Sequence, residues 1–176
     1  MLKIFVNTWG NYNENGADGG EWIELPLTPE ELSETLERIA KQMGDHDPEW
    51  AIHDSEWDGV ELFEIGEYDN IAQINETINE LATLDEWELE EVAAAVEAWG
   101  YNINEAIERQ QRGCFTFYRN MDLDDLAEEL ADEMIACYSN GEIPEIFTRY
   151  FDYGAFARDL GFDGYTETTY GVILDN

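Results

Sequence analysis

Carboxylates are the side chains of this sequence with the greatest capacity for chemistry, because 42 Asp and Glu stand against 8 Lys and Arg and 2 His. Calcium sites need several oxygen ligands, which spaced carboxylates supply. Residues 54–59 begin like the loop of an EF-hand, with oxygen donors at the first, third and fifth places and Gly59 at the sixth. Ile65 occupies the twelfth place, where a bidentate Glu is required, so the pattern disfavours an EF-hand.

Enzymatic catalysis finds little support in the residue pattern. The two histidines, His46 and His53, form no zinc-type spacing with cysteine, and the sequence has neither a phosphate-binding GxxxxGK[ST] loop nor a GxSxG turn. Among so many carboxylates, some pair reaches a glycosidase-like separation by chance. We expect His53 to be a hydrogen-bonded structural residue at a strand end. We therefore expect a protein that is not an enzyme and needs neither metal nor cofactor.

The net charge of −34 predicts a partner rich in positive charge. Self-repulsion at this charge destabilises a compact chain, so stability alone does not explain the excess. Nucleic acid and anionic membranes are excluded as partners, because both would be repelled. A halophilic coat would scatter its acids, whereas residues 42–108 hold 20 Asp and Glu and neither Lys nor Arg. A calcium-binding or halophilic-type solvated protein is the alternative interpretation.

The remaining composition is that of a folded, intracellular protein. Apolar residues make up 44% and aromatic residues 13% of the chain, far more than a disordered acidic tail contains. Cys114 and Cys137 lie in apolar runs, so we expect buried free thiols in a reducing cytoplasm. The sequence lacks a long apolar run or a recognisable targeting signal, which predicts a soluble cytoplasmic protein.

The N-terminal part has the pattern of a small sheet with one helix. Residues 2–6 and 21–25 are rich in β-branched and aromatic side chains and predict two strands, joined by an irregular loop rich in Asn and Gly. Thr28 is expected to start a helix with a capping box. A short strand at residues 50–53 is followed by an acidic stretch that we expect to be irregular as far as Asp69.

Helical patterns fill the middle of the chain, where residues 71–81 carry apolar side chains at helix spacing. A second helix follows, with an apolar stripe formed by Leu89, Val92, Val96 and Trp99.

The C-terminal part alternates between strand and helix patterns. A strand is predicted at residues 114–119 and a helix at 122–138, whose core side includes Met134 and Cys137. A helix at 153–160 and a hairpin at 165–174 complete the chain. The predicted fold class is α+β, with short antiparallel sheets in the N- and C-terminal parts of the chain and a helical middle. The pattern changes character after residues 69 and 112, and the length of the chain allows one domain or two to three small ones in series.

Dense carboxylates on rigid elements approximate the charge of B-form DNA, which carries about one negative charge per 1.7 Å of axis. Carboxylates four residues apart on a helix lie about 5–6 Å apart at Cβ. Two such files are expected to face outward on two helices: Glu86, Glu90 and Glu97 on the first, and Asp124, Glu128 and Asp132 on the second. The predicted phosphate-mimicking contacts are Asp45, Asp47, Glu49, Asp54, Glu56, Asp58, Glu61, Glu64, Glu67, Asp69, Glu76, Glu80, Glu86, Glu90, Glu97, Asp124, Asp125, Glu128 and Asp132.

Over essentially its full length, the chain resembles the ArdA family of antirestriction proteins. The most specific likeness lies in residues 50–54 (WAIHD), residues 63–68 (FEIGEY) and residues 150–160 (YFDYGAFARDL). The opening residues 4–7 (IFVN) and 10–13 (GNYN) are similar as well.

The resemblance implies an elongated chain of three small subdomains in a row: residues 1–69, residues 70–112 and residues 113–176. It also implies a homodimer joined through one end, with the dimer contact in the last subdomain, and a curved acidic rod that imitates bent DNA. Its implied target is the DNA-binding groove formed by the specificity and modification subunits of type I restriction-modification enzymes. The implied setting is a plasmid, transposon or phage that enters a restricting host.

Overall fold

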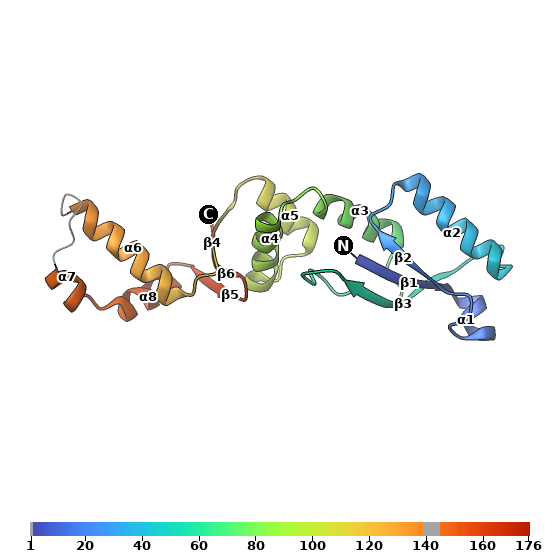
Figure 1. Cartoon of the computed structure of the whole chain (residues 1–176), viewed down its shortest axis with the longest axis horizontal. Coiled ribbons are helices and arrows are strands. Elements are labelled where there is room, and N and C mark those ends of the chain that lie inside the picture. Colours follow the sequence, from blue (N-terminus) through green and yellow to red (C-terminus); the bar gives the residue numbers. More distant parts are fainter. Residues whose placement is uncertain (1, 139–144) are drawn as a thin grey trace. The chain divides into compact units, whose positions relative to one another are not determined.

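A computed structural model describes residues 2–138 and 145–176 of the chain (Figure 1). The fold is mixed α and β, with a three-stranded antiparallel sheet in each terminal region and helices between them in the sequence. This arrangement of elements confirms the predicted fold class. The chain packs as two compact units, Met1–Asp85 and Glu86–Asn176. The division into three parts at residues 69 and 112 stays a prediction, because this packing does not test it.

The sheet of the first unit has β1 (Leu2–Thr8) in its centre, between β2 (Glu21–Leu25) and β3 (Trp50–Trp57). Leu2, Ile4 and Val6 are fully buried at alternate positions of β1, as expected for a central strand with a packed face. The last two residues of β1 are fully buried as well. Both pairings are antiparallel, and the register with β3 shifts between Phe5 and Val6.

A short helix, α1 (Trp9–Asn15), replaces part of the irregular loop predicted between the first two strands. Thr8 caps it by accepting a hydrogen bond from the backbone N–H of Asn11. The fully buried Asn7 accepts from the Asn11 amide and donates to the carbonyl of Gly16. The loop prediction was wrong here because this side-chain network, which periodicity does not report, holds a seven-residue sequence of low helix propensity in a helix.

The helix α2 (Pro29–Met43) begins as predicted, since Thr28 and Glu31 form a complete capping box. Strand β3 continues four residues beyond the predicted strand, to Trp57, so part of the stretch expected to be irregular is extended. The helix α3 (Ile71–Leu81) has the predicted bounds. Its buried Asn75 both donates to and accepts from the backbone of Leu27 at 2.8 Å, which fixes α3 next to the end of β2.

The second unit begins with α4 (Glu86–Trp99) and α5 (Ile103–Gln111), and its sheet follows the order β4 (Phe115–Arg119), β6 (Gly171–Asp175), β5 (Thr166–Thr168). The predicted strand and hairpin are confirmed. Gly171 is required where β6 starts, because its φ is +146° and a Cβ there would lie 2.2 Å from the carbonyl oxygen of Tyr118.

The apolar stripe predicted for α4 is only partly correct. Val92 is buried as expected, but Leu89, Val96 and Trp99 are half-buried, and the buried run is Glu91 to Ala95. Helix α4 contacts both α5 and the sheet of its unit, so two of its sides are covered rather than one stripe.

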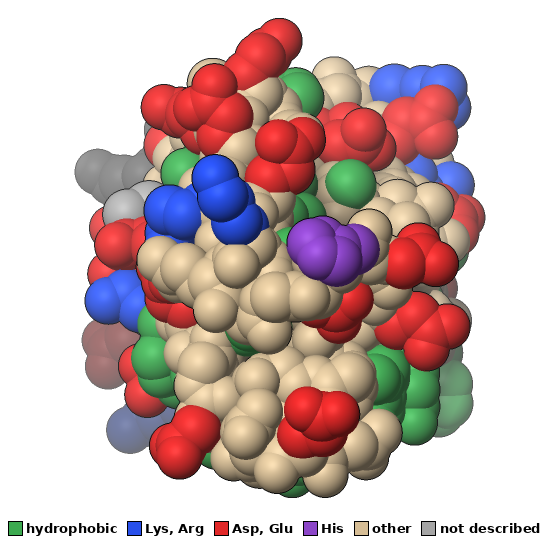
Figure 2. All heavy atoms as spheres, turned by 90° about the vertical axis from the view of Figure 1, so that its right-hand side faces the viewer, with side chains coloured by type: hydrophobic (Ala, Val, Ile, Leu, Met, Phe, Trp, Pro, Cys, Tyr) green, Lys and Arg blue, Asp and Glu red, His purple; other side chains and the backbone are tan. Residues whose placement is uncertain are grey.

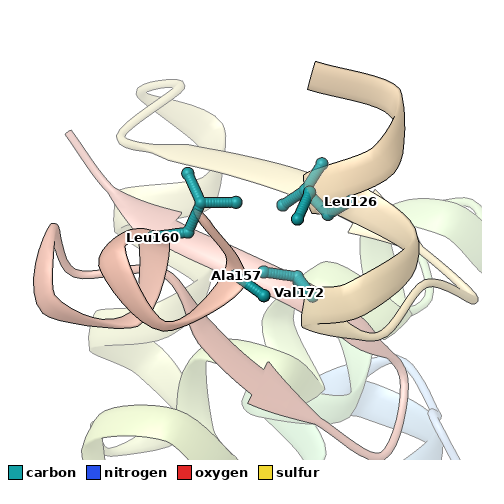
Figure 3. Packing of buried hydrophobic residues seen from close by; sticks show 5 residues of the cluster. Leu126, Ala157, Leu160 and Val172 are labelled. Carbon is teal, nitrogen blue, oxygen red and sulfur yellow. The ribbon is translucent and has the colours of Figure 1, made fainter. Parts of the chain in front are cut away.

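Between β4 and β5 lie α6 (Leu123–Tyr138), α7 (Glu145–Tyr150) and α8 (Tyr153–Phe162). Helices α6 and α8 run side by side (Figure 1), and their contact forms a hydrophobic core. Leu126 from α6 and Leu160 from α8 meet above Ala157 and Val172 (Figure 3).

This core covers only the first half of α6, which corrects two predictions. The described buried residues of α6 end at Ala131, and Met134, predicted to lie in the core, is 53% exposed. Cys137 is exposed and Cys114 is half-buried, so the expectation of two buried thiols was wrong. The reason is that α8 is shorter than α6, so that among the described residues Met134 and Cys137 lie beyond the core that the two helices share.

Candidate partner-binding surfaces

Strand β3 turns a row of carboxylates toward solvent. Asp54 and Glu56 are exposed, whereas Ser55 between them and Trp57 after them are half-buried. The alternation of a strand explains this pattern, and it places successive exposed carboxylates about 6–7 Å apart along the chain. Asp58, also exposed, follows directly after the strand. The sheet therefore holds these acids in a regular outward row.

Helix α3 exposes a second pair of acids on the side opposite its core. Ile74 and Ile78 are buried, while Glu76 and Glu80 are exposed one helical turn apart. Within the described part of the chain, neither carboxylate is bonded to a cation. They repel each other as well as neighbouring acids, and an external cation would relieve that repulsion.

The other predicted acids of the first unit lie on loops and differ in how firmly they are held. Asp45 is half-buried and accepts from the backbone N–H of Asp47 at 3.2 Å, and Asp69 accepts from that of Gly66 at 2.7 Å. Figure 2 shows carboxylates spread over one face of this unit, with fewer Lys and Arg among them. Exposed members of this set are Asp47, Glu49, Glu61, Glu64, Glu67 and Asp69.

Helix α6 carries more outward acids than the sequence analysis assigned. Asp124, Asp125 and Glu128 are exposed as predicted, and Glu129 and Glu133 are exposed too. The last two continue from Asp125 at four-residue spacing, a signal already present in the sequence that the predicted set omitted. Asp125, Glu129 and Glu133 form what we call the α6 file.

Asp132, predicted in an outward file with Asp124 and Glu128, is half-buried instead. Its carboxylate accepts a hydrogen bond from the hydroxyl of Tyr153 at 2.8 Å. The pKa of the Tyr153 hydroxyl is raised, and this hydrogen bond is the largest cause. Asp132 thus holds α8 beside α6.

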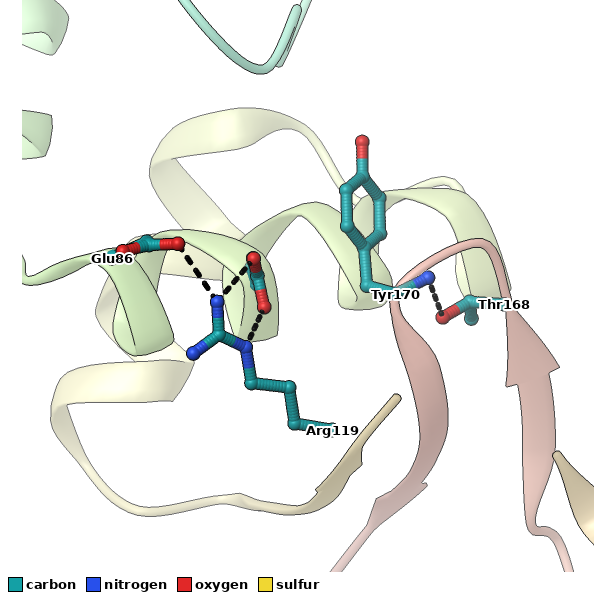
Figure 4. Close-up of polar contacts among 5 residues, drawn as sticks. Glu86, Arg119, Thr168 and Tyr170 are labelled. Carbon is teal, nitrogen blue, oxygen red and sulfur yellow. Dashed lines mark hydrogen bonds and ion pairs between the residues drawn. The ribbon is translucent and has the colours of Figure 1, made fainter. Parts of the chain in front are cut away.

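The predicted file on α4 does not face freely outward, which corrects the expectation from helix periodicity. Arg119, at the end of β4, binds both carboxylate oxygens of Glu90 and reaches Glu86 at 2.9 Å (Figure 4). The side chain of Glu90 is 17% exposed and that of Glu86 is 82% exposed. The pKa of Arg119 is raised by the hydrogen bonds to Glu90 and Glu86. We call this ion-paired group the Arg119 clamp.

Glu97, the third member of that file, is also engaged. Its carboxylate accepts from the backbone N–H of Thr169 at 3.0 Å and from the Thr169 hydroxyl at 3.1 Å. The three acids therefore tie α4 to the sheet of the second unit. Periodicity missed this because it marks the face of a helix without showing what packs on that face.

Four of the eight Lys and Arg side chains form ion pairs with carboxylates of their own unit in the described structure. The exposed acids of β3, α3 and the α6 file have no ion pair with Lys or Arg in the residues that the structure describes. The ion pairs are Arg38 with Glu21, Arg109 with Asp175, Arg112 with Glu108, and Arg119 with Glu86 and Glu90.

The segment that began like an EF-hand does not form a calcium loop. Asp54 and Glu56 lie in an extended strand, which spaces their carboxylates along a line instead of around one point. In the described residues, no group of three or more His, Cys, Asp and Glu is placed to hold a metal ion. Likewise, none of the described helices is both long and apolar enough to cross a membrane.

Comparison with known proteins gives one assignment for the whole chain. A family model described as Antirestriction protein (ArdA) matches residues 4–174, which include the acid rows of both units. No curated protein matches the chain.

Proposed function

This chain belongs to the ArdA family of antirestriction proteins, and we propose that it acts by imitating B-form DNA. In this proposal it occupies the DNA-binding groove formed by the specificity and modification subunits of a type I restriction-modification enzyme. No bond is made or broken, since the inhibitor only excludes DNA from the groove.

The observation that carries the proposal is that regular elements expose rows of carboxylates that have no ion pair with Lys or Arg among the described residues. Strand β3, helix α3 and helix α6 each fix the spacing of their acids through the backbone, so little conformational entropy is lost when a groove engages them. A groove lined with Lys and Arg is complementary to such rows in charge.

We place the main contacts on the exposed acids of these three elements, which include the predicted Asp54, Glu56, Glu76, Glu80, Asp124, Asp125 and Glu128, and we add Glu129 and Glu133. The exposed loop acids of the first unit extend this surface. Glu86, Glu90 and Glu97 are secondary in the proposal, because a groove would have to compete with Arg119 and Thr169 for them.

We also propose a homodimer formed through the C-terminal part, in line with the predicted dimer contact. Exposed apolar side chains of the second unit support it: Phe162 is 87% exposed, and Tyr150, Ile146 and Met134 are exposed as well. Burying such side chains against a second copy removes apolar surface from water. The proposed setting is the cytoplasm of a bacterium that a plasmid, transposon or phage has entered.

A binding competition tests the proposed function. The purified methyltransferase core of a type I enzyme is captured on the immobilised chain, with and without a duplex that contains its recognition sequence. We expect capture without DNA and progressive loss of capture as the duplex is added, because both ligands occupy one groove. Capture that the duplex leaves unchanged would contradict the proposal, and so would the absence of capture.

A further inference from the structure

An aromatic group beside the acids of the first unit has no role in the surfaces described so far. Trp9 and Tyr12 come from α1, His53 comes from β3, and Glu67 and Tyr68 follow the β3 strand in sequence. The backbone N–H of Ile52 donates to the carbonyl of Glu67 at 3.0 Å, which holds residues 67 and 68 against the sheet. We call Trp9, Tyr12, His53, Glu67 and Tyr68 the aromatic patch.

The rings of the aromatic patch are packed in two stacks. Tyr68 stacks on Trp9 with ring centroids 5.8 Å apart and planes 19° apart, and Tyr12 stacks on His53 at 4.2 Å and 17°. Trp9 also contacts both rings of the second stack in edge-to-face geometry, with planes 85° from Tyr12 and 75° from His53. These contacts fix the orientation of Tyr68, yet most of its surface remains accessible to solvent, because Tyr68 is 76% exposed.

A hollow of about 330 Å³ adjoins the patch and is lined by polar side chains. Asp54 and Glu67 contribute carboxylates to it, and His53 and Ser55 contribute further polar atoms. The Nδ1 atom of His53 is 3.6 Å from the Glu67 carboxylate, while its Nε2 atom is buried without a hydrogen-bond partner in the described structure. His53 was predicted to be a hydrogen-bonded structural residue, but its position is set mainly by ring packing.

We propose that the aromatic patch binds the guanidinium group of an arginine side chain from the protein partner, with Tyr68 as the stacking surface. A planar guanidinium stacks on an aromatic face and pairs with carboxylate oxygens in the same plane, and the exposed Tyr68 ring lies next in sequence to Glu67 and Asp69. An ammonium group lacks this planar stacking, so arginine is favoured over lysine. This inference rests on the proposed function, since it names one group that the acidic surface would recognise in the groove.

The patch differs from the acid rows in how its binding responds to salt. Attraction between exposed carboxylates and cations is screened as the ionic strength rises. Stacking of a desolvated guanidinium on a ring acts at short range and is screened much less. A variant that removes the ring should therefore weaken binding by a similar factor at low and at high salt.

The test measures the affinity of the full chain for the purified methyltransferase core over a range of salt concentrations. We expect Tyr68→Ser to weaken binding about five- to tenfold at every salt concentration, while Tyr68→Phe, which keeps the ring face, stays within about twofold of the original. Trp22→Ser is the matched control, since Trp22 is a partly exposed aromatic residue on β2 of the same unit. Thermal unfolding of each variant shows whether the fold is kept.

A second arm uses short arginine-only and lysine-only peptides, with tryptophan fluorescence as the readout. The proposal expects the chain to bind the arginine peptide more tightly, and expects Tyr68→Ser to abolish that preference. Equal binding of both peptides, or a folded Tyr68→Ser variant that binds the core as tightly as the original chain, would overturn the inference. If the original chain fails to bind the core, the proposed function fails. The peptide experiment then tests by itself whether the aromatic patch prefers arginine.

Discussion

Helices α4 and α6 of the second unit are both rich in acids, yet they use them differently. On α4, Glu90 is held by Arg119 and Glu97 is held by Thr169, so these carboxylates stabilise the unit. On α6, the α6 file faces solvent and has no bonded cation in the described residues. The comparison teaches that acid density alone does not mark a binding surface, because the neighbouring elements decide which acids stay available.

The largest expected effect comes from reversing the charge of Glu90, the α4 acid whose two carboxylate oxygens both bind Arg119. Glu90→Lys would place a cation against Arg119 in a position that is 17% exposed, so we expect a loss of about 3 kcal/mol in the free energy of unfolding. Urea unfolding followed by circular dichroism measures it. The matched control, Glu128→Lys on α6, should change this free energy by less than about 0.5 kcal/mol. Equal losses in both variants would remove the distinction between the two helices.

Neutralising the α6 file should affect binding instead of stability. With Asp125→Asn, Glu129→Gln and Glu133→Gln combined, we expect the affinity for the methyltransferase core to fall about ten- to a hundredfold, because three charge contacts with the groove are lost. The free energy of unfolding should be unchanged or slightly higher, since repulsion within the helix is relieved. Unchanged affinity would exclude α6 from the contact surface.

A third experiment uses Glu91, the α4 acid that is buried. The pKa of Glu91 is raised above its ordinary value of 4.5, and burial is the largest cause. The hydrogen bond from Gln110 at 3.2 Å lowers this pKa, whereas the nearby charge of Glu88 raises it. The folded state therefore binds this proton more tightly than the unfolded state, and the charged form costs stability as the pH rises through the folded pKa.

Glu91→Gln, which imitates the protonated form, should accordingly raise the free energy of unfolding by about 1 kcal/mol at pH 7. The difference should shrink toward zero at about pH 3, well below 4.5, where the original side chain is protonated in both states. Urea unfolding at the two pH values measures it. A variant that is less stable at pH 7 would show that the carboxylate is needed in its charged form.

The smallest expected effect concerns the exposed arm of the Arg119 clamp. Glu86 is 82% exposed, so solvent screens its ion pair, and Glu86→Gln should lower the free energy of unfolding by less than about 0.5 kcal/mol. Comparing this loss with that of Glu90→Lys shows how strongly the burial of an acid in the Arg119 clamp determines its contribution to the free energy of unfolding. A loss as large as that of Glu90→Lys would contradict the assigned difference.

Local signals in the sequence predicted most of the elements of this fold. The capping box at Thr28, the isoleucine spacing of α3 and the hairpin pattern of β5 and β6 each depend on residues close in sequence, and each was confirmed. Helix α1 was missed because the Asn7 network involves contacts that composition does not reveal.

The candidate site was less predictable, for a related physical reason. Arg119 is 29 residues from Glu90 in sequence, and Thr169 is 72 residues from Glu97. A helical periodicity computed on α4 contains no information about either partner. The window without Lys or Arg therefore suggested unpaired acids, whereas arginines outside that window reach Glu86, Glu90 and Glu108. The continuation of the α6 file, by contrast, was present in the four-residue spacing.

The central claim is that exposed, cation-free carboxylate rows provide the binding energy for the target groove. The salt dependence of the affinity between the full chain and a purified type I methyltransferase core tests it most directly. We expect the affinity to fall at least about a hundredfold between about 50 and 200 mM salt, as it does when many charge pairs form in one interface. An affinity that is the same across this range would contradict the claim.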